Sequence, residues 1–271
     1  MKTMVTFLGT ADVVPEAMND TTSILLNGTH LIDAGWNSPL NMLRFGFDPL
    51  DMQCLLLTHC HHDHYLGLAA ILFYLRMRQK ARRPQRVLQI FGPEADIYRT
   101  LERARSYLQI DRFPELELMT RVTRVRPGDS FETEQFDVST AAALHPVQGI
   151  VYRLRDKVTG VTLTISGDTA RNAHLTRLAE RCDLLIHEAS FGASPATKGV
   201  GHSSAIDAAH IASAAQVKQL ALVHCPQSLR DEALRAAQQI FPHTFLPAPG
   251  QTVEVAAGGA SPHDCQKFTS S

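Results

Sequence analysis

Six consecutive residues, His59-Cys60-His61-His62-Asp63-His64, restrict what this chain can fold into more than any other feature. They follow directly on Cys54–Thr58, an apolar run typical of a buried strand. Imidazoles and a carboxylate are therefore presented at the carboxyl end of a strand, where α/β sheets commonly hold their functional sites. Because zinc and similar divalent cations favour imidazole with carboxylate, the pattern predicts an α/β fold that carries a metal site.

Short apolar runs rich in Val, Ile, Leu and Thr recur along the chain and predict strands. We expect them at 5–10, 22–27, 30–35, 54–59, 87–92, 136–144, 150–155, 161–168, 183–188, 220–225 and 252–255. Tight hairpins are expected around Asn27-Gly28 and Thr159-Gly160, because glycine accepts the positive φ of such turns. Helical patterns lie between the strands at 65–80, 93–107 (opened by Pro93), 172–181, 203–215 and 228–240. The mixture predicts more than one sheet.

The composition suits one globular unit. A chain of 271 residues with 44% hydrophobic and 20% charged residues can bury a full core. We expect one domain at 1–256, followed by a loose polar tail at 257–271. The formal net charge of −1 gives no overall attraction to nucleic acid or anionic membrane. We find no apolar stretch that could cross a bilayer, no signal-peptide pattern, and five scattered cysteines that form no disulfide framework, so we expect a cytoplasmic protein.

The histidine-rich run cannot surround a metal pair alone, but other ligand-type residues also stand where strands are expected to end. These are His145, Asp168, His187-Glu188 and His224, together with His202, which precedes a helix after a glycine-rich loop. Two metals that share one hydroxide and one bridging carboxylate would lower the pKa of the bound water enough to give a nucleophile at neutral pH. The residues therefore indicate a metal-dependent hydrolase.

Motifs spread over nearly the whole chain resemble those of one superfamily. They are FLGTADVVP at 7–15, LIDAG at 31–35, THCHHDH at 58–64, IFGP at 90–93, ISGDT at 165–169, HEASF at 187–191, GHSSA at 201–205 and LVHCP at 222–226. With these motifs the chain resembles the metallo-β-lactamase superfamily and, within it, the ribonuclease Z-like branch.

The resemblance implies a four-layer αββα sandwich with two divalent metal ions at one edge of the sheets. By the same resemblance, one ion is held by His59, His61 and His145, the other by Asp63, His64 and His224, and Asp168 bridges them. Asp63 also counts as a catalytic residue. Zinc is the default metal, with manganese or iron as alternatives. Glu188 would orient His202, which would donate a proton to the leaving oxygen. A homodimer is also implied.

Two departures from the branch bear on the substrate. Members that trim transfer RNA commonly insert an RNA-gripping arm between the positions of His145 and Asp168, and this stretch is short here. Those members also carry a Gly-Leu-Pro-Gly-like loop after the metal motif, where this chain has YLGLAAILFYL. We therefore expect a phosphodiesterase that acts on a small nucleotide-like or cyclic phosphodiester, an anionic small molecule, through a metal-bridging hydroxide.

Other activities stay open at this point. They are a ribonuclease Z-type RNA 3′-end endonuclease, a lactonase, β-lactamase-like or arylsulfatase activity on the same metals, and a regulatory ligand-binding role with incidental turnover. The basic cluster Arg76 to Arg86 could contact phosphates or could be a solvated helix end.

Several polar residues are left outside the expected site. Cys60 and His62 should point away from the metals, and His187 is interpreted as a core residue. Asp33 either supports a metal ligand or stabilises a turn. Surface positions are expected for His30, His174, His210, His243 and His263.

Overall fold

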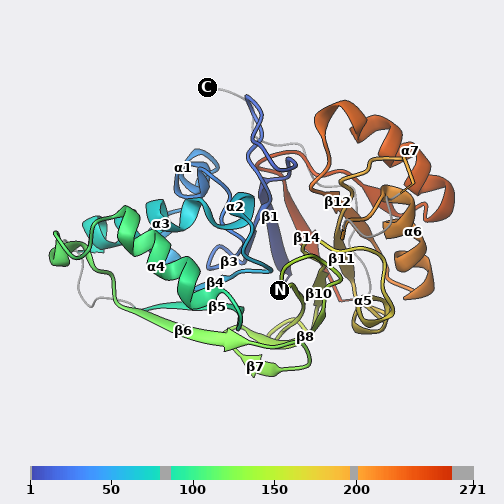
Figure 1. The fold of residues 1–271 in the computed structure, drawn as a ribbon. Helices are drawn as coiled ribbons and strands as arrows, with labels where there is room; N and C mark the ends of the chain where they lie inside the picture. Colours follow the sequence, from blue (N-terminus) through green and yellow to red (C-terminus); the bar gives the residue numbers. More distant parts are fainter. Residues whose placement is uncertain (1, 80–86, 196–200, 258–271) are drawn as a thin grey trace.

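Two seven-stranded β-sheets face each other in the computed structural model, which describes residues 2–79, 87–195 and 201–257 (Figure 1). The first sheet has the order β14 (Thr252–Val255), β1 (Thr3–Gly9), β2 (Ser23–Leu26), β3 (His30–Ile32), β4 (Cys54–Leu56), β5 (Leu88–Pro93) and β6 (Thr120–Val125). The second has the order β13 (Thr244–Phe245), β12 (Leu220–Val223), β11 (Leu184–Glu188), β10 (Thr162–Ile165), β9 (Ile150–Asp156), β8 (Phe136–Ala142) and β7 (Ser130–Glu132).

Helices cover the outer face of each sheet (Figure 1). On the first sheet lie α1 (Ser38–Arg44), α2 (His62–Tyr65), α3 (Gly67–Gln79) and α4 (Ile97–Tyr107), and on the second lie α5 (Ala173–Leu178), α6 (Ala205–Ala214) and α7 (Arg230–Ile240). One apolar cluster fills the space between the sheets, and two more lie under the helices. The four-layer αββα sandwich expected from the sequence is confirmed.

Parallel strands bring the ligand-bearing loops to one edge. Strands β3 to β6 pair in parallel, and so do β10 to β13, so the carboxyl ends of neighbouring strands meet. The two expected hairpins also form, β2 with β3 and β9 with β10. Positive φ angles of 48° at Asn27, 71° at Gly28 and 73° at Gly160 allow these turns.

Some elements differ from the sequence expectation. Pro93 is the last residue of β5, paired with Val125, and α4 begins only at Ile97 after a turn, so the helix that we expected to open at Pro93 starts later. Helix α1 was not predicted, because its buried residues include Ser38, Pro39 and Asn41 and give no apolar period. Strands β6 and β7 were also missed, since β6 buries only Val125, β7 buries no residue, and neither therefore shows an apolar run.

The ends of the predicted unit are only partly described. The predicted tail at 257–271 lies outside the described residues apart from Ala257, and the extent of the domain stays a prediction. Among the described helices, none is both long and apolar enough to span a membrane.

His30 corrects one sequence expectation, because it is buried rather than at the surface. Its ring lies between the sheets, with Nδ1 2.9 Å from the Thr29 hydroxyl and Nε2 2.9 Å from the Thr133 hydroxyl. The ring also meets Phe136 edge-on at a centroid distance of 5.0 Å. Burial lowers the pKa of His30 from 6.5 to about 4, so the ring is neutral in the folded protein at neutral pH.

We therefore predict an acid-sensitive contribution from His30. Below pH 6.5, His30 binds a proton in the unfolded chain, whereas in the folded chain it stays neutral down to about pH 4. The free energy of unfolding therefore falls between pH 6.5 and pH 4, by up to about 3 kcal/mol. His30→Gln lacks this titrating group. The difference in the free energy of unfolding between the wild type and His30→Gln should therefore become smaller as the pH falls. Urea unfolding at several pH values measures it, with the exposed His210→Gln as control. A difference in the free energy of unfolding that does not change with pH would contradict the lowered pKa of His30.

Candidate metal centre

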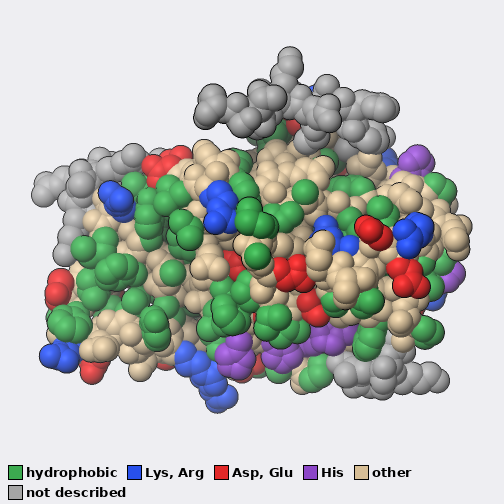
Figure 2. Space-filling view, turned by 90° about the horizontal axis from the view of Figure 1, so that it is seen from above, with side chains coloured by type: hydrophobic (Ala, Val, Ile, Leu, Met, Phe, Trp, Pro, Cys, Tyr) green, Lys and Arg blue, Asp and Glu red, His purple; other side chains and the backbone are tan. Residues whose placement is uncertain are grey.

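Histidine and carboxylate side chains gather at the edge where both sheets present their strand ends. Figure 2 shows histidine side chains collected along one side of the face that looks toward the top of Figure 1. His59 and His61 follow β4, Asp63 and His64 lie in α2, His145 follows β8, Asp168 follows β10, and His224 follows β12. The structure thus brings together all seven residues that the resemblance assigned to the metals.

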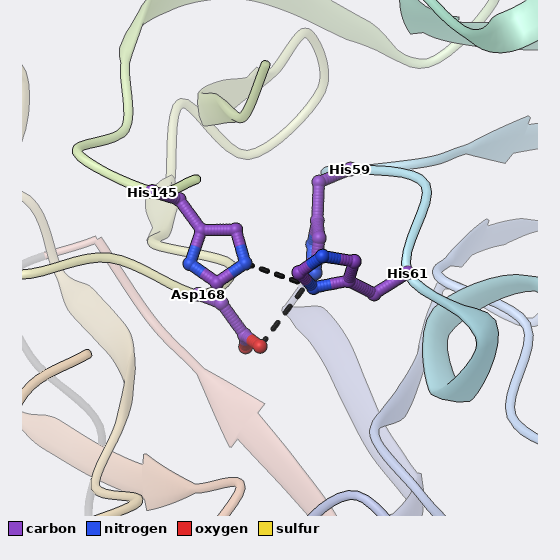
Figure 3. A group of neighbouring side chains, drawn as sticks. All are labelled: His59, His61, His145 and Asp168. Atoms are coloured by element: carbon purple, nitrogen blue, oxygen red, sulfur yellow. Dashed lines mark hydrogen bonds and ion pairs between the residues drawn. The ribbon is translucent and has the colours of Figure 1, made fainter. Parts of the chain in front are cut away.

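One group consists of His59, His61, His145 and Asp168, whose ligand atoms all lie within 4.8 Å of one another (Figure 3). His145 Nε2 is 2.9 Å from His61 Nδ1, and His59 Nε2 is 3.6 Å from Asp168 Oδ2. The four side chains come from three separate loops and point toward a common centre (Figure 3).

A second group consists of Asp63, His64, Asp168 and His224, again with ligand atoms within 4.8 Å. Asp63 Oδ2 lies 3.2 Å from His64 Nε2 and 3.1 Å from His224 Nε2. Asp168 Oδ1 is 3.4 Å from His64 Nε2, and its Oδ2 is 3.5 Å from His224 Nε2. Asp168 belongs to both groups, which is the position that a bridging carboxylate requires.

The donor atoms fit a divalent cation better than they fit one another. His59 is fully buried, and its Nε2 has no hydrogen-bond partner among the described residues. A buried polar atom without a partner costs free energy, so this nitrogen, aimed at a carboxylate 3.6 Å away, indicates an ion between them. Burial also lowers the pKa of His59, which leaves the ring neutral and able to act as a ligand.

In the second group, the nearby carboxylates determine the protonation of the two histidines. Burial opposes a charge on His64 and on His224, but the nearby carboxylate of Asp168 raises the pKa of both rings. The same histidines hold the pKa of Asp168 well below its usual range although the group is buried. The carboxylate of Asp168 therefore stays ionised and favours protons on the rings of His64 and His224, and a divalent cation would replace these protons on binding.

Asp33 holds one of the histidines in place. It has a φ of 57°, and its carboxylate accepts hydrogen bonds of 2.7 Å from both the Thr58 backbone N–H and the Thr58 hydroxyl. Its Oδ2 also lies 2.8 Å from His64 Nδ1, which directs His64 Nε2 at the other carboxylates. Of the two roles considered from the sequence, the geometry supports the ligand-orienting one, and the other contacts of the carboxylate bind Thr58 after β4.

We predict that Asp33→Asn weakens metal binding about 10–100-fold, because the amide presents an N–H₂ group where the carboxylate accepts. Asparagine keeps the size and tolerates the left-handed backbone. Titration of the metal-free protein with zinc against a chromophoric chelator measures the affinity. The exposed Asp137→Asn serves as control. Equal affinities in Asp33→Asn and the wild type would show that Asp33 serves only to hold Thr58 in place.

Glu188 and His202 form a pair beside these groups. His202 Nδ1 lies 3.0 Å from Glu188 Oε1, which also accepts a hydrogen bond from the Thr169 backbone N–H at 2.8 Å. The Glu188 side chain is buried, whereas that of His202 is 22% exposed. Burial opposes a charge on His202, but the Glu188 carboxylate raises its pKa. The pair can therefore present a protonated imidazole on the open side of the site.

Two residues of the site were not assigned from the sequence, Asp12 and Ser190. Asp12 Oδ1 is 3.1 Å from His224 Nδ1, and the Ser190 hydroxyl is 3.0 Å from the same nitrogen. Both lie inside quoted motifs, FLGTADVVP and HEASF, but their contacts depend on how distant loops meet. No spacing in the chain predicts them.

Three residues expected to lie outside the site, His187, His62 and Cys60, do so. His187 is fully buried, and its Nδ1 donates to its neighbour's carbonyl at 2.8 Å. His62 is exposed beside Tyr65, and Cys60 packs against the cluster beneath α3. The surface interpretation holds for His174, His210 and His243, while His263 lies outside the described residues.

The basic cluster is only partly described, because 80–86 lie outside the described residues. Arg76 donates to the Glu115 carbonyl, and Arg78 lies over the Tyr74 ring. Both stand near the end of α3 that is remote from the metal motif, about 14 Å or more along the helix axis. The contacts of these two side chains favour the interpretation of the basic cluster as a solvated helix end over a phosphate-binding role.

Comparisons with known proteins agree with this geometry. The family described as "Anti-Pycsar protein Apyc1" matches residues 3–243. A ribonuclease Z of Methanothermobacter thermautotrophicus is 28% identical over 311 aligned positions, covering 95% of this chain and 98% of that protein. A ribonuclease Z of Enterococcus faecalis is also 28% identical, with 92% and 96% covered.

Solved structures share the fold. The metallo-β-lactamase fold protein YhfI of Bacillus subtilis superimposes with a TM-score of 0.80 at 22% identity, covering 94% of this chain and all of that one. The short form of human tRNase Z superimposes with a TM-score of 0.75 at 22% identity, covering 94% of this chain and 100% of that one. A diphosphatase of the PhnP family superimposes with a TM-score of 0.69 at 18% identity, covering 93% of this chain and 97% of that one.

Proposed function

Since this chain belongs to the Anti-Pycsar protein Apyc1 family, within the ribonuclease Z-like branch of the metallo-β-lactamase superfamily, we propose that its metal-dependent hydrolysis is directed at a small phosphodiester, nucleotide-like or cyclic. The observation that carries this proposal is the placement of the Glu188–His202 pair directly beside two ligand groups that share Asp168.

The proposed cofactors are two divalent ions, zinc by default. His59, His61 and His145 would hold one, Asp63, His64 and His224 the other, and Asp168 would bridge them. When bound, the ions would lower the pKa of a water molecule and so supply a nucleophile at neutral pH. Asp63 would serve catalysis through its place among the ligands.

The chain's own residues supply the proton for the leaving group. Glu188 accepts from His202 Nδ1, which fixes the tautomer and leaves Nε2 facing the open side. His202 donates from Nε2 to the oxygen that leaves phosphorus, and the negative Glu188 stabilises the protonated ring beforehand. Glu188 is buried and has four hydrogen bonds, so it stays in place during the transfer.

A small substrate is supported by what lies between His145 and Asp168. This stretch holds β9 and β10, both built into the second sheet, and the tight turn that joins them. No arm extends from this described segment. The alignment with the Methanothermobacter ribonuclease Z runs over 311 positions against 271 residues here, so that relative has segments which this chain lacks.

The first test is metal content together with phosphodiester turnover. We predict about two equivalents of metal per chain, hydrolysis of bis-p-nitrophenyl phosphate that chelation abolishes, and loss of metal and turnover in His59→Ala. The exposed His210→Ala should behave as the wild type. Metal without phosphodiester turnover would move the assignment to lactone, β-lactam or sulfate esters, and protein that binds no metal would refute the proposal.

A second test addresses the proton donor. Glu188→Gln should lower kcat about 10²–10⁴-fold on a substrate with an alkoxide leaving group and change KM little, because the orienting carboxylate is lost while binding is kept. The exposed Glu232→Gln is the matched control. A kcat within a factor of about two of the wild type would show that the pair is structural.

Cleavage at RNA 3′ ends is the second candidate, favoured by the ribonuclease Z relatives. Comparing kcat/KM for cyclic nucleotides with that for a transfer RNA precursor decides between the two. The ligand-binding alternative predicts instead that Asp63→Ala keeps full biological activity. The homodimer and the cytoplasmic location stay predictions; sedimentation of the purified chain tests the first.

A further inference from the structure

Ser190 lies at the junction between the second ligand group and the proton-donor pair. Its hydroxyl is 2.6 Å from Glu188 Oε2, 3.0 Å from His224 Nδ1 and 3.2 Å from His202 Nδ1. Its backbone N–H also reaches Glu188 Oε2 at 3.2 Å. One side chain thus contacts a proposed metal ligand, a proposed proton donor and the carboxylate between them.

Hydrogen-bond accounting gives each contact a direction. A serine hydroxyl has one proton and two lone pairs, whereas an ionised carboxylate only accepts. The short contact to the buried Glu188 is therefore the one in which Ser190 donates. The serine oxygen is then left as an acceptor for the imidazole N–H groups that face it.

His224 gains its orientation from this acceptor. With Nδ1–H donated toward Ser190, Nε2 faces Asp63 Oδ2, 3.1 Å away, in the ligand group, where its lone pair would be available to a cation between the two atoms. Orienting contacts of this kind hold a metal-binding histidine in one tautomer and one rotation. The Nδ1–H of His202 is shared between Glu188 Oε1 at 3.0 Å and the serine oxygen at 3.2 Å.

We propose that Ser190 is a positioning residue that ties the geometry of the metal ligand His224 to that of the proton-donor pair Glu188–His202. This rests on the proposed function, because it assigns His202 to the leaving oxygen. Its removal should therefore have two separate effects, weaker metal binding and poorer proton delivery.

Asp12 provides the matched control. It contacts His224 Nδ1 at 3.1 Å, on the same nitrogen as Ser190, and no contact joins it to His202 or Glu188 among the described residues. Asp12→Ala should therefore weaken metal binding and leave proton delivery unchanged.

The experiment compares the wild type with Ser190→Ala, Ser190→Thr and Asp12→Ala, after thermal unfolding has shown that each variant folds. Zinc affinity is measured by competition with a chromophoric chelator. Turnover of the zinc-loaded proteins is measured on bis-p-nitrophenyl phosphate, whose leaving group needs little protonation, and on diphenyl phosphate, whose leaving group needs more.

We expect Ser190→Ala to lose zinc affinity about tenfold. Its kcat should fall at least about tenfold further on diphenyl phosphate than on bis-p-nitrophenyl phosphate. Ser190→Thr, which keeps the hydroxyl, should restore both. Asp12→Ala should lose affinity while the ratio of the two rates stays at the wild-type value.

Two results would overturn the proposal: unchanged zinc affinity in Ser190→Ala, or an equal loss of kcat on both esters. A failure of Ser190→Thr to recover would also reject the hydroxyl as the cause. If the wild type hydrolyses neither ester, the phosphodiesterase proposal fails, and the zinc affinities alone then decide whether Ser190 positions His224.

Discussion

The buried carboxylate of Asp168 is the group on which the rest of the site depends. It is 3% exposed, belongs to both ligand groups, and lies within 3.6 Å of ring nitrogens of His59, His64 and His224. Bringing these polar groups out of water is unfavourable unless opposite charge compensates them. A cation on each side of Asp168 would provide that compensation. The fold that buries this carboxylate therefore favours metal binding at the same place.

The sandwich makes this arrangement possible. Parallel strands in each sheet end at one edge, and two sheets packed face to face place their strand ends next to each other. Asp168 reaches the centre from the second sheet, and His59 from the first. Side chains far apart in sequence therefore meet at one place, as the two ligand groups show.

Much of this could be predicted from the sequence for a physical reason. A ligand-type residue after a buried apolar run must lie at a strand end, so the positions of His145, Asp168 and His224 followed from local pattern alone. The pairing of ligands into two groups did not follow from pattern, and it came from the resemblance.

What the sequence could not predict depends on contacts between distant segments. His30 looked like a surface residue because nothing local shows that Thr133 and Phe136 cover it. Asp12 and Ser190 meet His224 only once three loops have converged. Helix α1 escaped prediction since its buried side chains are largely polar and small.

Anomalous diffraction at the zinc absorption edge, from crystals grown with zinc, tests the central claim most directly. The account predicts two peaks, one among His59, His61 and His145 and one among Asp63, His64 and His224, with the Asp168 carboxylate between them. A single peak, or density in which Asp168 contacts no metal, would contradict the shared-carboxylate account.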